Sequence, residues 1–142
     1  MKRKYPKFPI LSAAGIIMIG GKVLIIKRLA EPKKGKWSVP GGVINLGERI
    51  EDGLKREVFE ETNIHVKVKE LIDIVERVIT DDNGRIVYHY VILDYLCEYI
   101  SGNIRVSSDA EDFALVKIDE LDNYDMVEGM KDIIKKANYQ RK

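Results

Sequence analysis

Two apolar runs of β type, separated by a pair of glycines, open the chain. Ala13–Ile19 and Val23–Lys27 are rich in β-branched residues, and Gly20-Gly21 can adopt the positive φ angles of a tight turn. We therefore predict a β-hairpin here. The glycines and Lys22 also interrupt the apolar stretch 10–26, which leaves neither half near the ~20 residues of a membrane-spanning helix and disfavours a signal peptide.

The middle of the chain changes from a helical to a β pattern. A polar loop (Ala30–Lys36) and an irregular Pro-Gly segment (Trp37–Gly42) precede a helix predicted from about Arg49 to Thr62. Ile86–Ile100 exposes few charges and is expected to be a central strand. Val66 and Val68 begin a strand whose β pattern Ile72–Thr80 continues, and residues 81–84 form a turn. Ile104–Val106 and Ala114–Ile118 are predicted as short strands.

Apolar residues recur at helical spacing near the C-terminus. They are Met126, Met130, Ile133, Ile134 and Ala137. Asp125 is the expected N-cap of this helix, with Glu128 as its capping-box partner. The element order β-β-α-β-β-β-β-α predicts an α/β (α+β) protein, with a mixed sheet packed between helices.

The composition fits one globular domain. The 142 residues are 45% hydrophobic and 33% charged, and Lys+Arg 24 against Asp+Glu 23 gives a net charge of +1, which excludes a polybasic protein. We predict a basic tail over residues 1–9 and a single domain over 10–142. The tail is expected to be solvated, with contact to phosphate or to a partner subunit as the alternative. The lone Cys97 lies in an apolar run, so we expect a buried, inert thiol and a cytoplasmic protein.

The predicted central helix gathers acids on one side. At 100° per residue, Glu57, Glu60 and Glu61 fall within about 100° of one another. A hard divalent cation, Mg²⁺ or Mn²⁺, would offset their repulsion. The alternative is a solvated acidic face. Gly53 favours a cation site over a solvated face. It costs the helix about 1 kcal/mol relative to Ala and leaves room for a ligand or loop to approach.

The segment from Gly42 to Ile64 resembles the Nudix box, the signature of Nudix hydrolases. The matching positions are Gly42, Glu48, Arg56, Glu57, Val58, Glu60, Glu61 and Ile64. Asn63 stands where the pattern has Gly, at the expected left-handed position after the helix, which Asn adopts more readily than most residues. We expect a small stability cost there and an intact site. The element order is also similar to the Nudix α/β/α sandwich.

The resemblance implies a metal-dependent hydrolase that cuts the diphosphate linkage of a nucleoside diphosphate derivative. The implied ligands of Mg²⁺ or Mn²⁺ are Glu57, Glu60, Glu61 and the carbonyl of Gly41. Glu48 and Arg56 would form the structural ion pair of the family. Crowding among acids raises a carboxyl pKa, so Glu57 or Glu60 could accept the proton of the attacking water.

Members of the family use a further acid beyond the central strand, and the candidates here are Asp109, Glu111 and Asp112. We favour Glu111 as the catalytic residue among them. Trp37, Tyr88 and Tyr90 are candidates for stacking on a nucleobase, with core or rim packing as the alternative.

The chain length and the strand YHYVILDYL resemble small ADP-ribose pyrophosphatases, so ADP-ribose, cleaved to AMP and ribose 5-phosphate, is the first substrate expected. The proline that many of those enzymes carry downstream of the box is missing, since none follows Pro40. Nucleoside triphosphates and diadenosine polyphosphates therefore stay open. A non-catalytic nucleotide-binding module is the alternative of another class. We expect a small-molecule substrate, no nucleic-acid or membrane partner, and, by analogy, a homodimer.

Overall fold

The computed structural model describes residues 3–107 and 110–141, except for the side chain of Glu111. Its elements are, in order, β1 (Ile10–Ile19), β2 (Lys22–Arg28), β3 (Trp37–Ser38), β4 (Gly41–Val43), α1 (Ile50–Thr62), β5 (His65–Thr80), β6 (Ile86–Ser101), β7 (Ala110–Lys117), the 3₁₀ helix η1 (Ile118–Asn123) and α2 (Met130–Gln140). No helix in the described ranges is long and apolar enough to cross a membrane.

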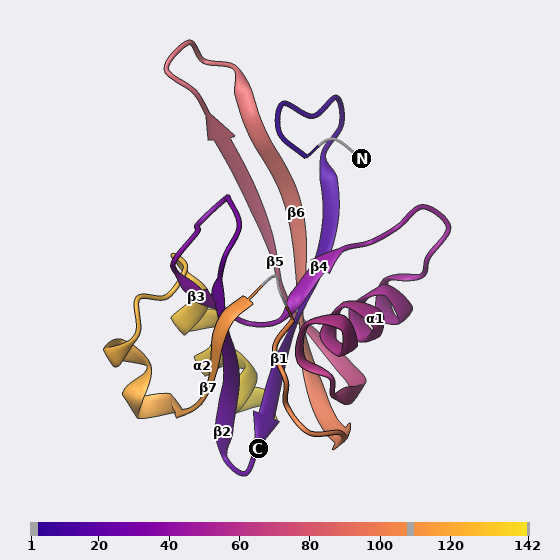
Figure 1. Cartoon of the computed structure of the whole chain (residues 1–142), viewed down its shortest axis with the longest axis vertical. Coiled ribbons are helices and arrows are strands. Elements are labelled where there is room, and N and C mark those ends of the chain that lie inside the picture. The colour runs from indigo at the N-terminus through magenta and orange to yellow at the C-terminus, as the bar shows by residue number, and fades with distance from the viewer. Residues whose placement is uncertain (1–2, 108–109, 142) are drawn as a thin grey trace.

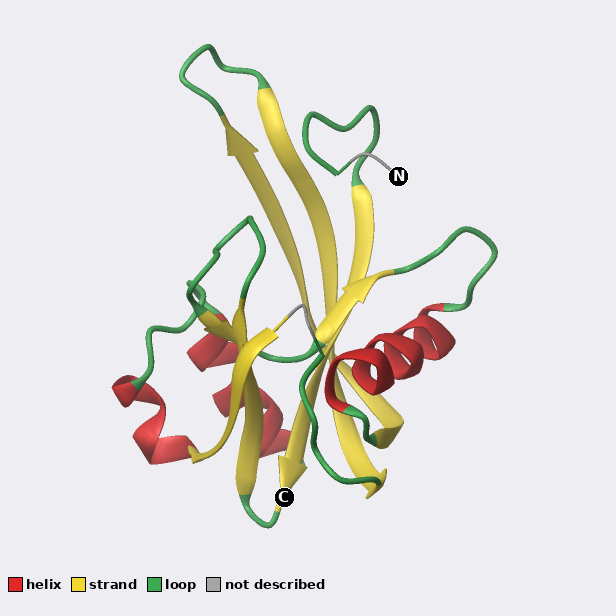
Figure 2. Cartoon of the chain, in the orientation of Figure 1, coloured by secondary structure: helices red, strands yellow, loops and turns green. Residues whose placement is uncertain are grey.

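The strands form one mixed sheet (Figure 2). Its order is β3-β2-β1-β6-β5, with β4 also paired to β1 and β7 to β2. β1 and β6 run parallel, from the pair Ile10 and Tyr90 to the pair Met18 and Glu98, while the other strand pairs are antiparallel. The predicted β1–β2 hairpin and the interior position of β6 are both confirmed.

The two α-helices cover opposite faces of this sheet (Figure 1). Side chains alternate along β1, so Ile17 packs with Leu54 of α1 while Ile16 packs with Ile134 of α2. The expected mixed sheet between helices is thus confirmed. Cys97 of β6 is buried on the α1 side, and burial raises the pKa of its thiol to about 12, as expected for an inert thiol.

β5 and β6 form a long hairpin that extends beyond the rest of the sheet (Figure 1). The strand that Val66 and Val68 were predicted to begin and Ile72–Thr80 to continue is confirmed as the single strand β5. Register shifts between Val68 and Glu70 and between Leu71 and Asp73 interrupt its alternation. These irregularities explain why the apolar pattern of β5 breaks between Val68 and Ile72.

The strand predicted at Ile104–Val106 is wrong. This segment has no regular structure and instead follows the C-terminal end of α1. Arg105 N–H donates to the Thr62 carbonyl at 2.9 Å, and Ser107 N–H donates to the Glu61 carbonyl at 2.9 Å. The last carbonyls of a helix need donors from outside it, and this apolar-looking segment supplies two.

The predicted start of the C-terminal helix is also wrong. α2 begins at Met130, after Gly129 with φ 83°, and neither Asp125 nor Glu128 caps it. Trp37 N–H donates to the Asp125 carbonyl at 2.9 Å, and Val127 N–H donates to the Trp37 carbonyl at 2.8 Å. Residues 125–127 are therefore held beside β3, which prevents them from joining the helix.

The Trp37–Gly42 segment is more regular than its prolines and glycines suggest. Ser38 of β3 pairs with Ile26, and Gly41 and Gly42 of β4 pair with Ala14 and Ala13. The sequence did not reveal these two strands because they are short and lack a β-type pattern. They form because neighbouring strands supply their hydrogen-bond partners. The predicted strand end at Ile118 likewise gives way to η1, which starts there.

Candidate active site

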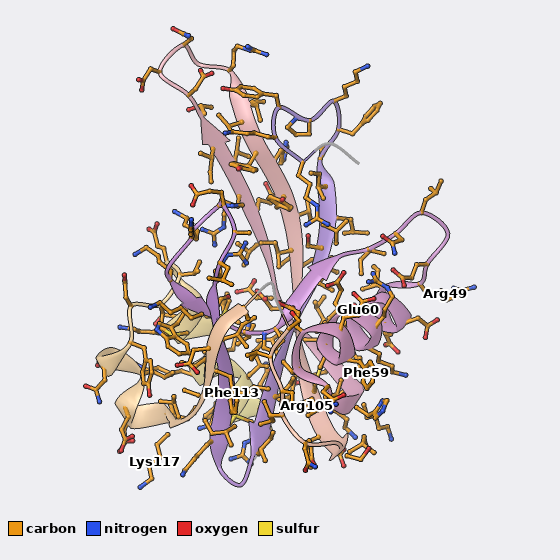
Figure 3. The ribbon with its side chains drawn as sticks, in the orientation of Figure 1. Arg49, Phe59, Glu60, Arg105, Phe113 and Lys117 are labelled. Atoms are coloured by element: carbon orange, nitrogen blue, oxygen red, sulfur yellow. The ribbon has the colours of Figure 1, made fainter. Side chains whose placement is uncertain are left out.

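The carboxylates of α1 lie against the glycine backbone of β4. Gly41 N–H donates to Glu61 Oε1 at 2.8 Å. A Cβ atom at Gly42 would overlap the Glu57 carboxylate, so only glycine allows this contact. Figure 3 labels Glu60 on the same helix. Gly42 therefore lets the acidic side of α1 approach β4, whereas a Cβ atom at Gly41 would meet the backbone of β1 at Ala13 and Ala14.

Arg56 connects these acids to the loop that precedes α1. Its Nε and Nη2 donate to the two carboxylate oxygens of Glu48, at 2.7 and 3.0 Å. Its Nη1 donates to Glu57 Oε1 at 2.8 Å and to Glu60 Oε2 at 3.2 Å. Nη2 also donates to the Val43 carbonyl at 3.1 Å. One guanidinium thus links β4, the loop and the acidic side of α1, and the ion pair implied by the family resemblance is present.

Gly53 makes room for that loop. A Cβ atom there would lie 2.7 Å from both Glu48 Oε1 and Ile44 Cδ1. The Arg56 hydrogen bond and then the Asn45 N–H lower the pKa of Glu48 to about 2, so this carboxylate stays ionised. The missing side chain within the acidic helix therefore accommodates a protein loop, one of the two interpretations open from the sequence.

Glu57 and Glu60 have different surroundings. The side chain of Glu57 is 17% exposed, whereas that of Glu60 is 57% exposed. Burial raises the pKa of Glu57, the Arg56 guanidinium opposes this shift, and Glu60 adds to it. Glu57 is therefore the carboxylate whose proton affinity the fold increases.

The donor set suits a hard divalent cation, although the ligands are not gathered into a ready-made cluster. Among the described residues, no group of three or more His, Cys, Asp or Glu side chains is arranged to hold a metal. Arg56 Nη1 lies between Glu57 and Glu60, and Glu61 faces the Gly41 amide. Carboxylate oxygens beside side-chain-free glycines are the chemistry that Mg²⁺ prefers. The ligand set stays a prediction.

The predicted aromatic residues do not share one place. Trp37 contacts Tyr124 edge to face, with ring centroids 5.2 Å apart, and packs against the core on the α2 side. Tyr88 stacks on Tyr90 with centroids 6.1 Å apart. Tyr90 is buried in a separate cluster with Val43 of β4. The tyrosine pair, and not Trp37, is thus linked to the strand that carries the glycines.

Comparison with known proteins decides the family. A model of the NUDIX domain matches residues 9–137. The chain belongs to the Nudix family. An ADP-ribose pyrophosphatase from Methanocaldococcus jannaschii is 31% identical over 113 residues, which cover 80% of this chain and 64% of that protein. The chain thus spans less than two thirds of that relative.

Two further relatives carry MutT-like or nucleoside triphosphatase names. Nucleoside triphosphatase NudI of Escherichia coli K12 is 30% identical over 99 residues, covering 65% of this chain and 69% of that protein. The crystal structure of a MutT NUDIX hydrolase from Burkholderia pseudomallei superposes with a TM-score of 0.79 and 28% identity, covering 92% of this chain and 98% of that one. The α/β/α sandwich and the Nudix family expected from the sequence are both confirmed.

The further acid of this Nudix domain stays a prediction. Asp109 lies outside the described residues, and Glu111 belongs to β7 with its side chain outside them. Asp112 is exposed and accepts a hydrogen bond from the N–H of its neighbour Phe113 at 2.7 Å. The structure therefore does not choose among the three.

Sequence reasoning missed Asp94, an acid within the apolar strand β6. Asp94 is 0% exposed, and neither of its carboxylate oxygens has a hydrogen-bond partner in the described part of the chain. Burial and then the charge of Asp73 raise the pKa of Asp94, Arg77 opposes them, and the result is a pKa of about 7. A lone acid within a run of apolar residues was the available signal, because such a residue must be buried if the strand is interior.

Proposed function

We propose that this Nudix hydrolase cleaves the diphosphate linkage of a nucleoside diphosphate derivative, with ADP-ribose as the main candidate and AMP and ribose 5-phosphate as products. The observation that carries this proposal is the placement of the α1 carboxylates on the glycine backbone of β4, held by Arg56. The name of the M. jannaschii relative supports ADP-ribose as the substrate. NudI supports a nucleoside triphosphate as the alternative, and diadenosine polyphosphates stay open.

Glu57, Glu60, Glu61 and the Gly41 carbonyl would hold Mg²⁺ or Mn²⁺. When bound, the cation would neutralise phosphate charge and lower the pKa of a water molecule. Glu57 is our choice of general base, because burial raises its pKa and its carboxylate lies on β4. Glu60 and Glu111 are the alternatives. The ion pair of Arg56 with Glu48 holds the loop against α1, so these two residues position the acids.

The surroundings of the reaction belong to the same proposal. We place the protein in the cytoplasm, with a small nucleotide as its partner and no nucleic acid or membrane. The balanced charge and the buried single thiol support this view. We also propose a homodimer, which light scattering of the purified protein tests directly.

Product analysis tests the function. Purified protein is incubated with ADP-ribose, diadenosine polyphosphates and nucleoside triphosphates, with Mg²⁺ or with a chelator. The variants are Glu60→Gln and Glu61→Gln, with Asp52→Asn as an exposed control on the same helix. We expect a nucleoside monophosphate only with metal, and far less of it from the first two variants. Nucleotide binding without metal and without turnover would instead favour a non-catalytic binding module.

A further inference from the structure

β5 is a long strand at the edge of the sheet. It has 16 residues, and among the described residues β6 is the only strand that pairs with it. The outer part of the β5–β6 hairpin projects clear of both α-helices (Figure 2). The backbone N–H and C=O groups along such an edge are free to pair with another strand.

The N-terminal segment covers the opposite edge of the same hairpin. Tyr5 N–H donates to the Val87 carbonyl of β6 at 2.7 Å, and the Tyr5 hydroxyl donates to Asp81 Oδ2 at 3.0 Å. The guanidinium of Arg85 lies 4.5 Å from the centre of the Tyr5 ring. The chain therefore protects the β6 edge of the hairpin and leaves the β5 edge open.

Three large apolar side chains of β5 are half-exposed on one side of the sheet. Leu71, Ile74 and Val78 are 43%, 53% and 50% exposed. Leu71 is opposite Tyr95, which packs in the core under α1, and Ile74 is opposite Leu93, two residues before Tyr95 on β6. Val78 follows Ile74 on the same side of the strand. A second strand beside β5 would cover this apolar strip.

The hydrogen bonds of Ile74 show which backbone groups the edge presents. Ile74 N–H donates to Oδ1 of its neighbour Asp73 at 2.8 Å, so it points to the open edge and not to β6. Backbone groups alternate along a strand, and those of Glu76 and Val78 therefore point the same way. The side chain of Asp73 holds the place that a carbonyl of a partner strand would take.

The charges of β5 complement those of a second copy in one register. Two antiparallel copies related by a two-fold axis are centred on one residue, which faces itself. Centred on Val75, the pairing sets Asp73 of each copy opposite Arg77 of the other. Centred on any charged residue from 73 to 77 it sets like charges opposite, and centred on Ile74 or Val78 it makes no opposite-charge pair.

Asp73 and Arg77 are available for such pairs. Within the described residues, neither of them forms an ion pair within 4.0 Å. They lie in the stretch of β5, residues 73–79, that pairs with β6 without a register shift. The strand is therefore regular where the copies would meet.

We propose that the outer edge of β5 is the interface between two copies of this chain, joined antiparallel about Val75. Asp73 of each copy pairs with Arg77 of the other, which releases Ile74 N–H to the carbonyl of Glu76 in the second copy. The two sheets then form one continuous sheet. This interface rests on the homodimer of the proposed function and is independent of the proposed reaction.

Charge reversal tests the interface by light scattering over a range of protein concentrations. Arg77→Asp alone and Asp73→Arg alone each set like charges opposite one another twice, and each should raise the Kd of the dimer by about tenfold. In an equimolar mixture, the two introduced charges face each other and the two native charges keep their pairing. A heterodimer about as stable as the wild-type dimer should therefore form, which also shows that both variants are folded.

Glu76→Lys is the matched control, because it reverses a charge on the opposite side of the same strand. It should dimerise like the wild type. If Arg77→Asp and Asp73→Arg also dimerise like the wild type by themselves, the copies meet through another face and the proposal is overturned.

Cross-linking tests the register. Residues that face each other on the axis in a non-hydrogen-bonded pair have Cα atoms about 4.5 Å apart, within reach of a disulfide. Val75→Cys should therefore link two copies under mild oxidation, and the native thiol of Cys97 is buried. Val78→Cys is more exposed than position 75 but three residues from the axis, so it should stay unlinked. Equal linking of both variants would contradict the pairing about Val75.

Product analysis of the same proteins separates the interface from the reaction. A dimer that follows the charge pattern without any turnover would support the interface and refute the proposed reaction. A wild type that cleaves its substrate as a monomer would leave the reaction standing. It would overturn the interface and leave the β5 edge to a strand of another protein.

Discussion

Arg56 illustrates how much a single residue organises here. Its five donors are fixed in a planar fork, and they reach Glu48, Glu57, Glu60 and the Val43 carbonyl at once. Lysine carries the same charge but cannot satisfy these acceptors together. The site therefore depends on the shape of the guanidinium as well as on its charge.

Glu57→Gln tests the proposed base. The amide keeps the size of the side chain but can neither accept the water proton nor supply a full negative charge to a cation. We expect kcat to fall by roughly 10²–10⁴ with little change in thermal stability. Rates of product formation, compared with Asp52→Asn, provide the measurement. Activity near that of wild type would contradict this assignment and indicate that Glu60 or Glu111 is the general base.

The raised pKa of Asp94 predicts that the free energy of unfolding depends on pH. Its pKa is about 7 in the folded chain against an ordinary value of 3.8, so the folded state holds the proton more tightly. The free energy of unfolding should therefore fall as the pH rises from about 4 to about 7, and then level off. Asp73 and Arg77 are the charged groups that face it.

Urea unfolding at about pH 5 and about pH 8 checks this prediction. Asp94→Asn, which cannot ionise, should lose less stability between the two conditions than wild type does. Glu76→Gln, at an exposed position of β5, is the control and should change the difference only slightly. An identical pH dependence in wild type and Asp94→Asn would contradict the assignment.

At the scale of an element, α1 is built around the loop that it contacts. Its buried face carries Leu54 and Val58, while Gly53 accommodates Glu48. Asn63 ends the helix in the left-handed region, with φ 65°, and its N–H donates to the Phe59 carbonyl at 2.8 Å. The expectation for this position is confirmed. Its side chain also donates to the Asn103 carbonyl at 3.0 Å, which explains why Asn serves here.

Gly53→Ala should destabilise the protein although Ala is the better helix former. The added Cβ would lie 2.7 Å from Glu48 Oε1 and from Ile44 Cδ1, and relieving this overlap should outweigh the helical gain of about 1 kcal/mol. Thermal unfolding and activity should both decline. Glu51→Ala, at an exposed position of the same helix, is the matched control. A rise in melting temperature for Gly53→Ala would show that the loop yields without cost.

At the scale of the whole molecule, the sheet brings distant segments together. β4 and β6, which are far apart in the sequence, lie close together because β1 pairs with both of them. A ligand that binds where α1 contacts β4 should therefore stabilise the entire fold by mass action.

Thermal unfolding with Mg²⁺ and AMP tests that linkage. Ligand at about one hundred times its Kd should add about 2.7 kcal/mol, which amounts to a rise in melting temperature of several degrees. The combined variant Glu57→Gln and Glu60→Gln should lose the part of the rise that needs Mg²⁺. An undiminished rise would place the cation elsewhere.

Local features of this protein follow from its sequence. Each of these features depends on residues that are near in the sequence. They are the β1–β2 hairpin, α1, its acids three and four residues apart, and the turn at Asn63. Their periodicity and turn chemistry are visible without the fold. The box from Gly42 to Ile64 is such a local pattern, and it was sufficient to indicate the family.

Tertiary structure decided the rest. Three features depend on contacts between segments far apart in the chain. They are the parallel pairing of β1 with β6, the extended course of residues 125–127 beside Trp37, and the burial of Asp94. The same holds for the meeting of Arg77 with Tyr90. Long-range packing selects among conformations that local propensity leaves nearly equal in free energy, so only the folded chain shows which side chains meet.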